Sequence, residues 1–255
     1  MKRFFDTIKN IFKIEDLRSR IFLTLGYIVI YRLGAHVVLP GINPNELAGL
    51  AKQTSEGVLS LLDMFSGGAF SNASIFALGI MPYISASIVV QLLGIAVPYF
   101  QRLQREGESG RKKMNQITRY LTIGILILQA PTYVANLHAQ LPPEAFVLTG
   151  SFFTVSSVLI LTAGTMFVMW LGEKITDRGI GNGISLIIMI GIIARLPYAF
   201  FGEAVIRFEE IGGGLLILVL EIIALFVIFM VSIALVQAIK RIPIQYTKRV
   251  IENKQ

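Results

Sequence analysis

The chain has 255 residues, of which 54% are hydrophobic and 15% charged, and its mean hydropathy is +0.69. This composition excludes an ordinary soluble domain and predicts an all-α membrane protein, a polytopic helix bundle. The chain has no cysteine, which excludes a disulfide framework and a thiolate metal site. We expect neither a cofactor nor a bound metal.

Residues 1–20 predict a helix that lies on the cytoplasmic surface of the membrane. Their apolar side chains fall near one helical stripe, and six Lys and Arg residues occupy polar positions. A cleaved signal peptide would need a small-residue cleavage site after the apolar run, and the sequence shows none. Residues 21–39 form the expected first span, ended by Pro40-Gly41, and Arg32 within it is expected to snorkel outward or to pair.

Residues 57–91 have the pattern of a broken membrane element, in which a short apolar piece, a glycine pair and a long apolar piece follow without a soluble linker. The short piece cannot cross a hydrocarbon core about 30 Å thick, which needs about 20 helical residues. Gly67 and Gly68 can adopt backbone angles closed to other residues. We therefore expect them to separate the short piece from a span that begins near Ala73.

The long piece is expected to kink at Pro82, because proline removes one hydrogen bond of the helix. Four of its residues share one helical face that runs from apolar to polar, namely Ile80, Ile84, Ser87 and Gln91. Two interpretations remain open for the polar part of this face. It either bonds to neighbouring helices or forms a wall that meets water, since an unpaired amide in hydrocarbon is costly.

The rest of the chain alternates short polar loops with apolar runs. In order we expect a basic loop at 102–113, a third span at 117–137, an outer loop at Pro142-Pro143, a fourth span at 152–172, a fifth span to about residue 201 and a sixth span at 214–236. Gly179, Gly181 and Gly183 resemble a phosphate loop only superficially, because no strand precedes them. A tight reversal between two spans, with Asn182 as a helix cap, explains them better.

Positive charge is distributed unevenly over these loops. Most of the 23 Lys and Arg residues precede the first span, lie in the basic loop, lie between the fourth and fifth spans, or follow the sixth span. An even number of crossings places all of these segments on one side of the membrane. The positive-inside rule predicts that this side is the cytoplasm.

Two stretches of the chain resemble a known family. Residues 78–93, LGIMPYISASIVVQLL, resemble the second-span signature of SecY, the protein-conducting channel subunit, and residues 63–69, DMFSGGA, resemble its plug. Further blocks resemble the family at 17–20 together with 39–42, at 105–112 and at 170–185. The resemblance covers essentially the whole chain but only about the first half of the family's ten-span inverted-repeat fold. It implies a five-span first half at 21–201 with a plug at about 57–72, an external loop and sixth span at 202–236, and the start of a basic cytoplasmic loop at 237–255.

The resemblance also implies roles for individual residues. A hydrophobic pore ring would contain Ile80, Ile84, Ile184 and Ile188, and in each pair the spacing of four presents two branched side chains on one helical face. The plug would contain Leu61, Leu62, Met64, Phe65, Gly67, Gly68 and Phe70, and the lateral gate Ser85, Ser87 and Gln91. The tail residues Lys240, Arg241, Lys248 and Arg249 would contact the ribosome or SecA, although their charge fits a plain positive-inside loop equally well.

The resemblance implies that the whole protein is the central pore subunit of the Sec protein translocase. Such a protein is a channel and not an enzyme. It would lie in the bacterial cytoplasmic (inner) membrane with its amino terminus in the cytoplasm. Unfolded polypeptides would pass across the membrane or laterally into it. The implied partners are the SecE and SecG subunits, the motor SecA, the ribosome, the unfolded polypeptide and membrane lipid, but not DNA.

Two other classes of function can be compared with this one. A secondary transporter also uses broken helices near the middle of the membrane. It requires buried ionisable groups, but only Arg32, Arg195 and Glu221 lie within or at the edges of spans, and Glu221 has no evident partner in the sequence. An intramembrane enzyme is disfavoured, because no carboxylate pair or nucleophile and base share a membrane depth.

Overall fold

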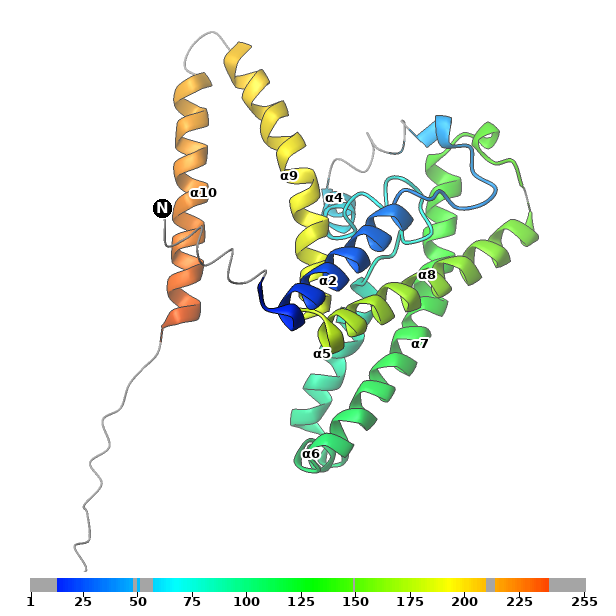
Figure 1. Ribbon diagram of the computed structural model, residues 1–255. Helices are drawn as coiled ribbons and strands as arrows, with labels where there is room; N and C mark the ends of the chain where they lie inside the picture. Colours follow the sequence, from blue (N-terminus) through cyan, green and yellow to red (C-terminus); the bar gives the residue numbers. More distant parts are fainter. Residues whose placement is uncertain (1–12, 48–49, 51–56, 149, 210–213, 239–255) are drawn as a thin grey trace, which may run out of the picture. The chain divides into compact units, whose positions relative to one another are not determined.

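The computed structural model describes residues 13–47, 50, 57–148, 150–209 and 214–238, and the regular secondary structure of these residues is helical (Figure 1). The helices in order are α2 (Glu15–Gly34), α4 (Gly57–Phe65), α5 (Met81–Ala96), α6 (Pro98–Arg105), α7 (Glu108–Gln140), α8 (Ser151–Arg178), α9 (Gly183–Glu209) and α10 (Gly214–Gln237), with 3₁₀ turns η1 (Pro44–Leu47) and η2 (Pro143–Ala145). The predicted all-α fold is confirmed. The chain divides into two compact units, residues 1–197 and 198–255. The predicted surface helix lies mostly outside the described residues.

Four of the described helices, α7 to α10, are long and apolar enough to cross a membrane. The pair α5 and α6 would make a fifth span if counted as one, but the pair is bent by 98° at Val97. Helix α2 covers most of the predicted first span. It does not meet the same criterion, because Arg18, Arg20 and Arg32 lower its apolar character.

The ends of several helices differ from those expected. Helix α9 continues through Pro197 to Glu209 instead of ending near residue 201, so part of the predicted external loop is helical. Glu203 and Arg207 form an ion pair of 2.9 Å one turn apart, which supports this extension. Helix α10 matches the predicted sixth span closely. In the second unit Glu221 pairs with Arg207 at 3.0 Å, which corrects the expectation that Glu221 lacks a partner.

The predicted basic loop at 102–113 is almost entirely helical. Helix α6 and the start of α7 are joined at Glu106 and Gly107, and Gly107 has a φ of +70° that favours glycine. A Cβ atom at Gly110 would overlap the backbone of α6, so the two helices pack against each other closely. The sequence was misleading because a run of charged residues favours a loop or the solvent-facing side of a helix equally.

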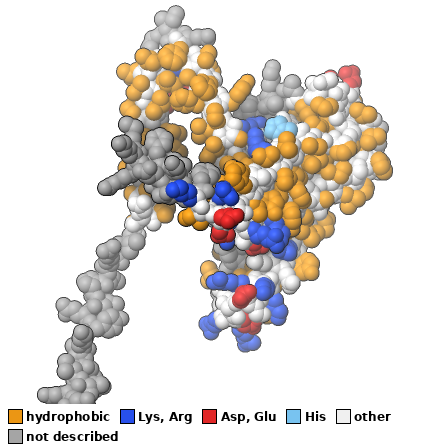
Figure 2. All heavy atoms as spheres, viewed as in Figure 1, with side chains coloured by type: hydrophobic (Ala, Val, Ile, Leu, Met, Phe, Trp, Pro, Cys, Tyr) orange, Lys and Arg blue, Asp and Glu red, His pale blue; other side chains and the backbone are white. Residues whose placement is uncertain are grey.

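In the first unit, α7 packs against α5 and α8, and α8 also packs against α2. The Arg119 side chain donates two hydrogen bonds to Glu173, of 3.1 and 2.6 Å, and thereby joins the start of α7 to the end of α8. The Ile180 backbone N–H donates to Thr24 Oγ1 at 3.2 Å, which brings the turn between α8 and α9 to the middle of α2. Figure 2 shows charged side chains gathered toward this end of the unit. Several segments that the sequence predicts to be cytoplasmic therefore lie toward the same end of the first unit.

The opposite end of this unit is an apolar core under two short connections. The Asn43 N–H donates to the Ala145 carbonyl at 2.9 Å, and the Val147 N–H donates to the Gly41 carbonyl at 2.9 Å, so the segments carrying η1 and η2 lie side by side. Large side chains such as Leu137 and Phe153 are fully buried beneath them. The broken membrane element lies in the region between these two ends.

Candidate functional site

The broken element begins with a short helix that cannot cross a membrane. Helix α4 has nine residues, so it is about 14 Å long at 1.5 Å per residue. It ends at Phe65 and is followed by Gly67 and Gly68, whose φ angles are +66° and +90°. The prediction that the glycine pair separates a non-spanning half-helix from the next helix is confirmed. We call residues 66–71 the glycine turn.

The helix after the glycine turn starts later than expected, at Met81 and not near Ala73. Residues 66–80 form successive turns, in which Ala73 and Gly79 have positive φ angles and Ser74 Oγ accepts a hydrogen bond from the Phe76 N–H at 3.2 Å. Such local bonds compete with a helix. Pro82 consequently lies in the first turn of α5, where its missing N–H has no helical acceptor, so the predicted kink at Pro82 is wrong. The bend occurs at Val97 and Pro98 instead.

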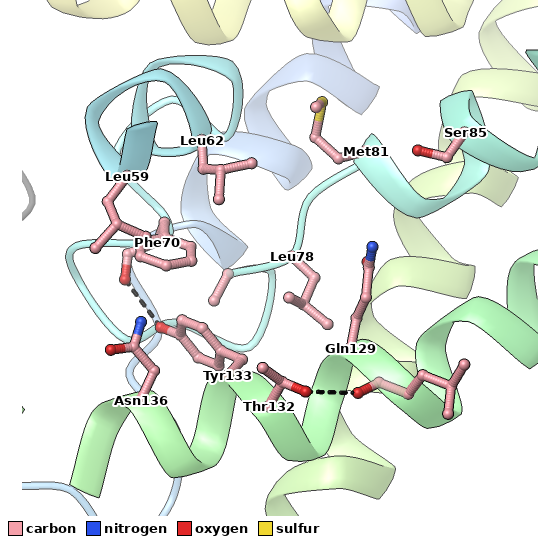
Figure 3. A pocket seen from close by; sticks show the side chains of 12 residues that line it. Leu59, Leu62, Phe70, Leu78, Met81, Ser85, Gln129, Thr132, Tyr133 and Asn136 are labelled. Carbon is pink, nitrogen blue, oxygen red and sulfur yellow. Dashed lines mark hydrogen bonds between the residues drawn. The ribbon is translucent and has the colours of Figure 1, made fainter. Parts of the chain in front are cut away.

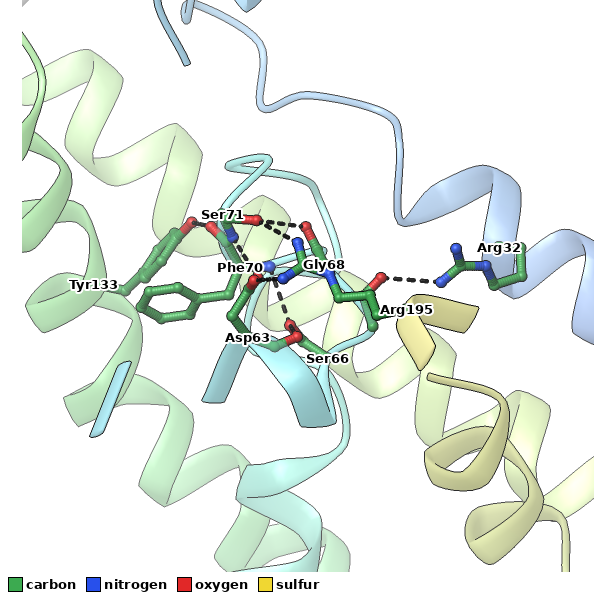
Figure 4. A network of polar contacts seen from close by, with 9 residues as sticks. Arg32, Asp63, Ser66, Gly68, Phe70, Ser71, Tyr133 and Arg195 are labelled. Carbon is green, nitrogen blue, oxygen red and sulfur yellow. Dashed lines mark hydrogen bonds and ion pairs between the residues drawn. The ribbon is translucent and has the colours of Figure 1, made fainter. Parts of the chain in front are cut away.

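An ion pair joins α4 to α9 across the glycine turn (Figure 4). The Arg195 guanidinium donates from Nη1 to Asp63 Oδ2 and from Nη2 to Ser71 Oγ, the latter at 2.9 Å. The Ser71 backbone N–H donates to Asp63 Oδ1 at 2.8 Å. Each of Asp63, Ser71 and Arg195 thus forms a hydrogen bond with both of the others. The Asp63 side chain is only 3% exposed, whereas that of Arg195 is 46% exposed.

Three further side chains, from α2 and α7, bind backbone carbonyls of the glycine turn. Tyr31 Oη donates to the Ser66 carbonyl at 3.1 Å, and Arg32 Nη1 donates to the Gly67 carbonyl at 3.0 Å. Tyr133 Oη donates to the Phe70 carbonyl at 2.9 Å. Arg32, which the sequence predicted would snorkel or pair, therefore finds a backbone partner. The turn is held from α2, α7 and α9 at once.

The glycines of the turn are required by these contacts as well as by their backbone angles. A Cβ atom at Gly67 would lie 2.9 Å from Arg32 Nη1, and one at Gly68 would lie 2.9 Å from Arg195 Nη2. Gly191 on α9 contributes a third close approach, since its Cβ would lie 3.1 Å from the Phe65 carbonyl. Because these three glycines have no side chain, two guanidinium groups and helix α9 can approach the backbone of the turn closely.

The structure brings the four predicted ring residues together. We call Ile80, Ile84, Ile184 and Ile188 the isoleucine cluster. Ile80 is buried, and the other three are partly buried against a core that contains Tyr31, Phe76 and Ile187. Ile80 directly precedes α5, Ile84 lies in its first turn, and the other two come from the start of α9.

The same face of α9 serves both the isoleucine cluster and the glycine turn. Ile184, Ile188, Gly191 and Arg195 follow one another at spacings of four, three and four residues, which places them on one side of a helix. The first two belong to the isoleucine cluster, and the last two contact the turn or α4. The two regions are therefore connected through one rigid element.

The entry of α9 into this arrangement depends on the turn before it. Asn182 Oδ1 accepts hydrogen bonds from the Ile184 and Ser185 N–H groups at 3.1 and 3.2 Å, so the predicted helix cap is confirmed. Thr176 Oγ1 accepts from the Gly183 N–H at 2.9 Å. A Cβ atom at Gly183 would overlap the backbone of Gly172 on α8, so the two helices meet closely where the isoleucine cluster begins.

The predicted plug and gate residues occupy different environments. Of the plug residues, Gly67, Gly68 and Phe70 are buried, Leu62 and Phe65 are partly buried, and Leu61 and Met64 are exposed. Of the gate residues, Ser85 and Gln91 are exposed and Ser87 is partly buried. Gln91 Nε2 donates to Ser87 Oγ at 3.1 Å, a bond within α5 itself. The tail residues Lys240, Arg241, Lys248 and Arg249 lie outside the described residues.

A cavity of about 510 Å³ lies beside α4, between the glycine turn and α7 (Figure 3). Its wall is mostly apolar, with Leu62 and Leu78 among its residues, and the neutral side chains of Ser85, Gln129 and Asn136 also line it. Its lining residues carry no charge, and it leaves free space beside α4. Within the described part of the chain, no group of three or more His, Asp or Glu residues could hold a metal ion.

Several residues of this site were not predicted from the sequence. Asp63 falls within the predicted plug but has no role of its own there, and Arg195 is noted within a span without a partner. Tyr31, Tyr133 and Gly191 were not singled out either. One available signal was the spacing from Ile184 to Arg195, which places the arginine on the same helical face as the ring residues. No local pattern could have identified Asp63 as its partner, because the two residues are 132 positions apart.

Comparison with known proteins gives consistent results. A sequence profile described as SecY matches residues 74–255. The chain is 43% identical over 253 residues to the protein translocase subunit SecY of Streptomyces scabiei, which covers 94% of this chain and 56% of that protein. It is also 43% identical over 250 residues to the protein translocase subunit SecY of Aquifex aeolicus, covering 95% of this chain and 57% of that protein. The chain thus spans just over half the length of these curated relatives.

Among solved structures, the chain is similar to Sec61 in the canine ribosome-channel complex from the endoplasmic reticulum. The TM-score is 0.52 at 17% sequence identity, and the similarity covers 89% of this chain and 49% of that chain. At this identity the similarity supports the fold alone.

Proposed function

The chain belongs to the SecY family, and from this premise we propose that it forms the central pore of a protein-conducting channel. It is a multi-pass membrane protein with bacterial relatives. Unfolded polypeptides would cross the membrane through it or leave it laterally into the lipid. The chemistry required of such a channel is small, since the substrate changes place and no bond is made or broken.

The observation that carries this proposal is the position of the isoleucine cluster next to a non-spanning helix. Four branched apolar side chains from α5 and α9 lie together, and the glycine turn that follows α4 contacts the same face of α9. A narrow apolar constriction excludes water when it is empty. It also binds no particular sequence strongly, so a passing chain could slide through it. We assign the isoleucine cluster to the pore ring and residues 57–72 to the plug.

The polar residues Ser85, Ser87 and Gln91 of α5 are proposed as part of the lateral gate. Ser85 and Gln91 are exposed and Ser87 is partly buried. In hydrocarbon such groups would be costly. A wall that borders a water-filled passage on one side and lipid on the other would allow them to be solvated.

The proposed orientation places the amino terminus in the cytoplasm of a bacterium, with the charged end of the first unit on the same side. Exposed Arg102, Arg105 and Arg111 lie at this end, in agreement with the positive-inside rule. SecE, SecG, the motor SecA and the ribosome are the proposed partners, through that end and the basic tail after Lys240. The name of the similar Sec61 structure, a ribosome-channel complex, supports the ribosome as one of them.

A secondary transporter remains the second candidate because of one observation. The ion pair between Asp63 and Arg195 beside a broken helix is the type of buried charge that ion-coupled transport uses. Family membership favours the channel. Accumulation of a small solute driven by an ion gradient, without passage of polypeptide, would favour the transporter.

The test of the pore uses the assembled channel in a planar bilayer. Replacing Ile84 and Ile184 together by Ser should raise the resting ion conductance, because a wider and wettable constriction no longer excludes water. Deleting residues 61–70 should also raise it. Cysteines at positions 84 and 184 should cross-link to a stalled translocating chain, whereas a cysteine at the exposed Ile127 of α7 should not. Unchanged conductance in both variants, with no cross-link from either position, would overturn the pore assignment.

The orientation is tested separately by labelling single cysteines, since the chain has none of its own. In intact cells an impermeant thiol reagent should label Glu144→Cys and not Gln104→Cys. The reverse pattern would invert the proposed topology and move the proposed partner surface to the other side.

A further inference from the structure

We propose that Asp63 and Arg195 form a latch that positions α4 and the glycine turn against α9 while the channel is closed. This inference rests on the proposed function, because it assigns the mechanism that keeps the plug in place. The latch consists of the ion pair and of Ser71, which binds both partners.

The latch differs from the other contacts of the glycine turn in what it joins. Tyr31, Arg32 and Tyr133 bind backbone carbonyls of residues 66–70, so they hold the turn and not the helix before it. Asp63 belongs to α4 itself. Among the described ion pairs, the pair between Asp63 and Arg195 is the one that connects α4 to another helix.

The position of Arg195 connects the latch with the isoleucine cluster. Arg195 lies seven residues after Ile188, which is two helical turns, or about 10 Å, along the same face. A movement of α9 that widens the cluster therefore moves the guanidinium relative to α4. Opening the ring and releasing the plug become linked events, and the cavity beside α4 offers space next to this helix.

The burial of the two partners makes the latch asymmetric. The Asp63 carboxylate is almost fully buried, and loss of Arg195 leaves its charge with one remaining donor, the Ser71 N–H. Arg195 is half exposed, so loss of the Asp63 charge leaves a cation that the described residues do not enclose. An unpaired buried charge is much more costly than an unpaired exposed one. Removing the arginine should therefore release α4 more than removing the carboxylate charge does.

The reporter is a single cysteine at Ala69, a residue of the glycine turn with no exposed surface. In native membranes that contain the full chain in its assembled channel, the rate of alkylation of Ala69→Cys by N-ethylmaleimide measures how often the turn opens. In this background Arg195→Gln should raise the rate by at least about tenfold. Asp63→Asn should raise it by less, about threefold. Arg195→Lys, which keeps the charge but not both arms of the guanidinium, should lie between the parent and Arg195→Gln.

Two further variants separate the latch from general damage to the fold. Asp63→Asn combined with Arg195→Gln should react more slowly than Arg195→Gln alone, because the buried charge that the single variant leaves unpaired is gone. Arg119→Gln removes an equally well-formed pair between α7 and α8 that does not touch α4, and it should leave the rate unchanged. An increase with Arg119→Gln as large as that with Arg195→Gln would overturn the latch, as would a double variant that reacts faster than both single variants.

Resting conductance distinguishes failure of the latch from failure of the proposed function. If deletion of residues 61–70 raises conductance but Arg195→Gln changes neither conductance nor alkylation, the pore stands and the latch is overturned. If Arg195→Gln raises alkylation while neither the deletion nor the isoleucine variants raise conductance, the ion pair holds the turn but the turn does not close a pore. If Arg195→Gln raises both measurements, the latch and the plug are supported together.

Discussion

The glycine turn and the isoleucine cluster are neighbours on one face of α9, but different forces hold them. The turn is fixed by directional contacts, in which hydroxyl and guanidinium groups from α2, α7 and α9 reach its backbone and the side chains of Asp63 and Ser71. The cluster is held by apolar packing, which has no preferred direction. Directional contacts specify one position of the turn. Apolar packing can adapt to different neighbours, and the comparison predicts that the two regions respond differently to mutation.

The largest effect is expected where the turn needs a glycine. Gly68→Val places a branched side chain at a φ of +90° and 2.9 Å from the Arg195 guanidinium, so we expect a loss of about 3 kcal/mol of stability. Thermal unfolding of the purified chain in detergent would measure it. The matched control is Gly124→Ala on α7, where a Cβ atom meets no neighbour within 4 Å and should stabilise the helix slightly. Equal midpoints for the two variants would show that the turn is not rigidly specified.

A smaller effect is expected when one hydroxyl of the turn is removed. Tyr133→Phe loses the 2.9 Å hydrogen bond to the Phe70 carbonyl, which keeps a weaker one from the Ala73 N–H, so the expected cost is about 1 kcal/mol. It should also raise the alkylation rate of Ala69→Cys. Tyr120→Phe, at a largely exposed position of the same helix, is the control and should change neither. A change in stability without a change in alkylation would separate Tyr133 from the closure of the turn.

Shortening a side chain of the isoleucine cluster should separate packing from closure of the turn. Ile80→Val removes one methyl group from a buried position, and we expect a cost of up to about 1 kcal/mol. Ile80 forms none of the hydrogen bonds or ion pairs that hold the turn, although Ala69 packs in the same core. The alkylation rate of Ala69→Cys should therefore rise by less than it does with Tyr133→Phe. An increase comparable to that of Tyr133→Phe would mean that packing of the cluster holds the turn, and the two regions would then be one.

The smallest effect is expected on the polar face of α5. Ser87→Ala removes the 3.1 Å bond to the exposed Gln91 side chain, and its cost should stay within about 0.5 kcal/mol. Resting conductance should also be unchanged, because this face is assigned to the gate and not to the seal. A rise in conductance would place Ser87 in the seal and enlarge the region that closes the channel.

The sequence alone determined those features that depend on neighbouring residues. The positions of the long apolar helices follow from the length and hydropathy of their runs, and α10 matched its predicted bounds within a residue. Turn chemistry is also local, so the break at Gly67 and Gly68 and the cap at Asn182 were predicted correctly. Helical periodicity likewise placed Ile184 and Ile188 on one face.

The tertiary structure decided everything that depends on residues far apart in the chain. A proline kinks a helix from within but is tolerated in its first turn. Pro82 lies in the first turn of α5 because hydrogen bonds such as that from the Phe76 N–H to Ser74 Oγ keep the preceding residues out of the helix. Phe70 and Tyr133 are 63 positions apart, and Asp63 and Arg195 are 132 apart. Local patterns contain no information about such pairs. Their partners are selected by where the fold places Asp63 and the glycine turn relative to Tyr133 on α7 and Arg195 on α9, because a buried charge or hydroxyl is stable only where the folded chain supplies its partner.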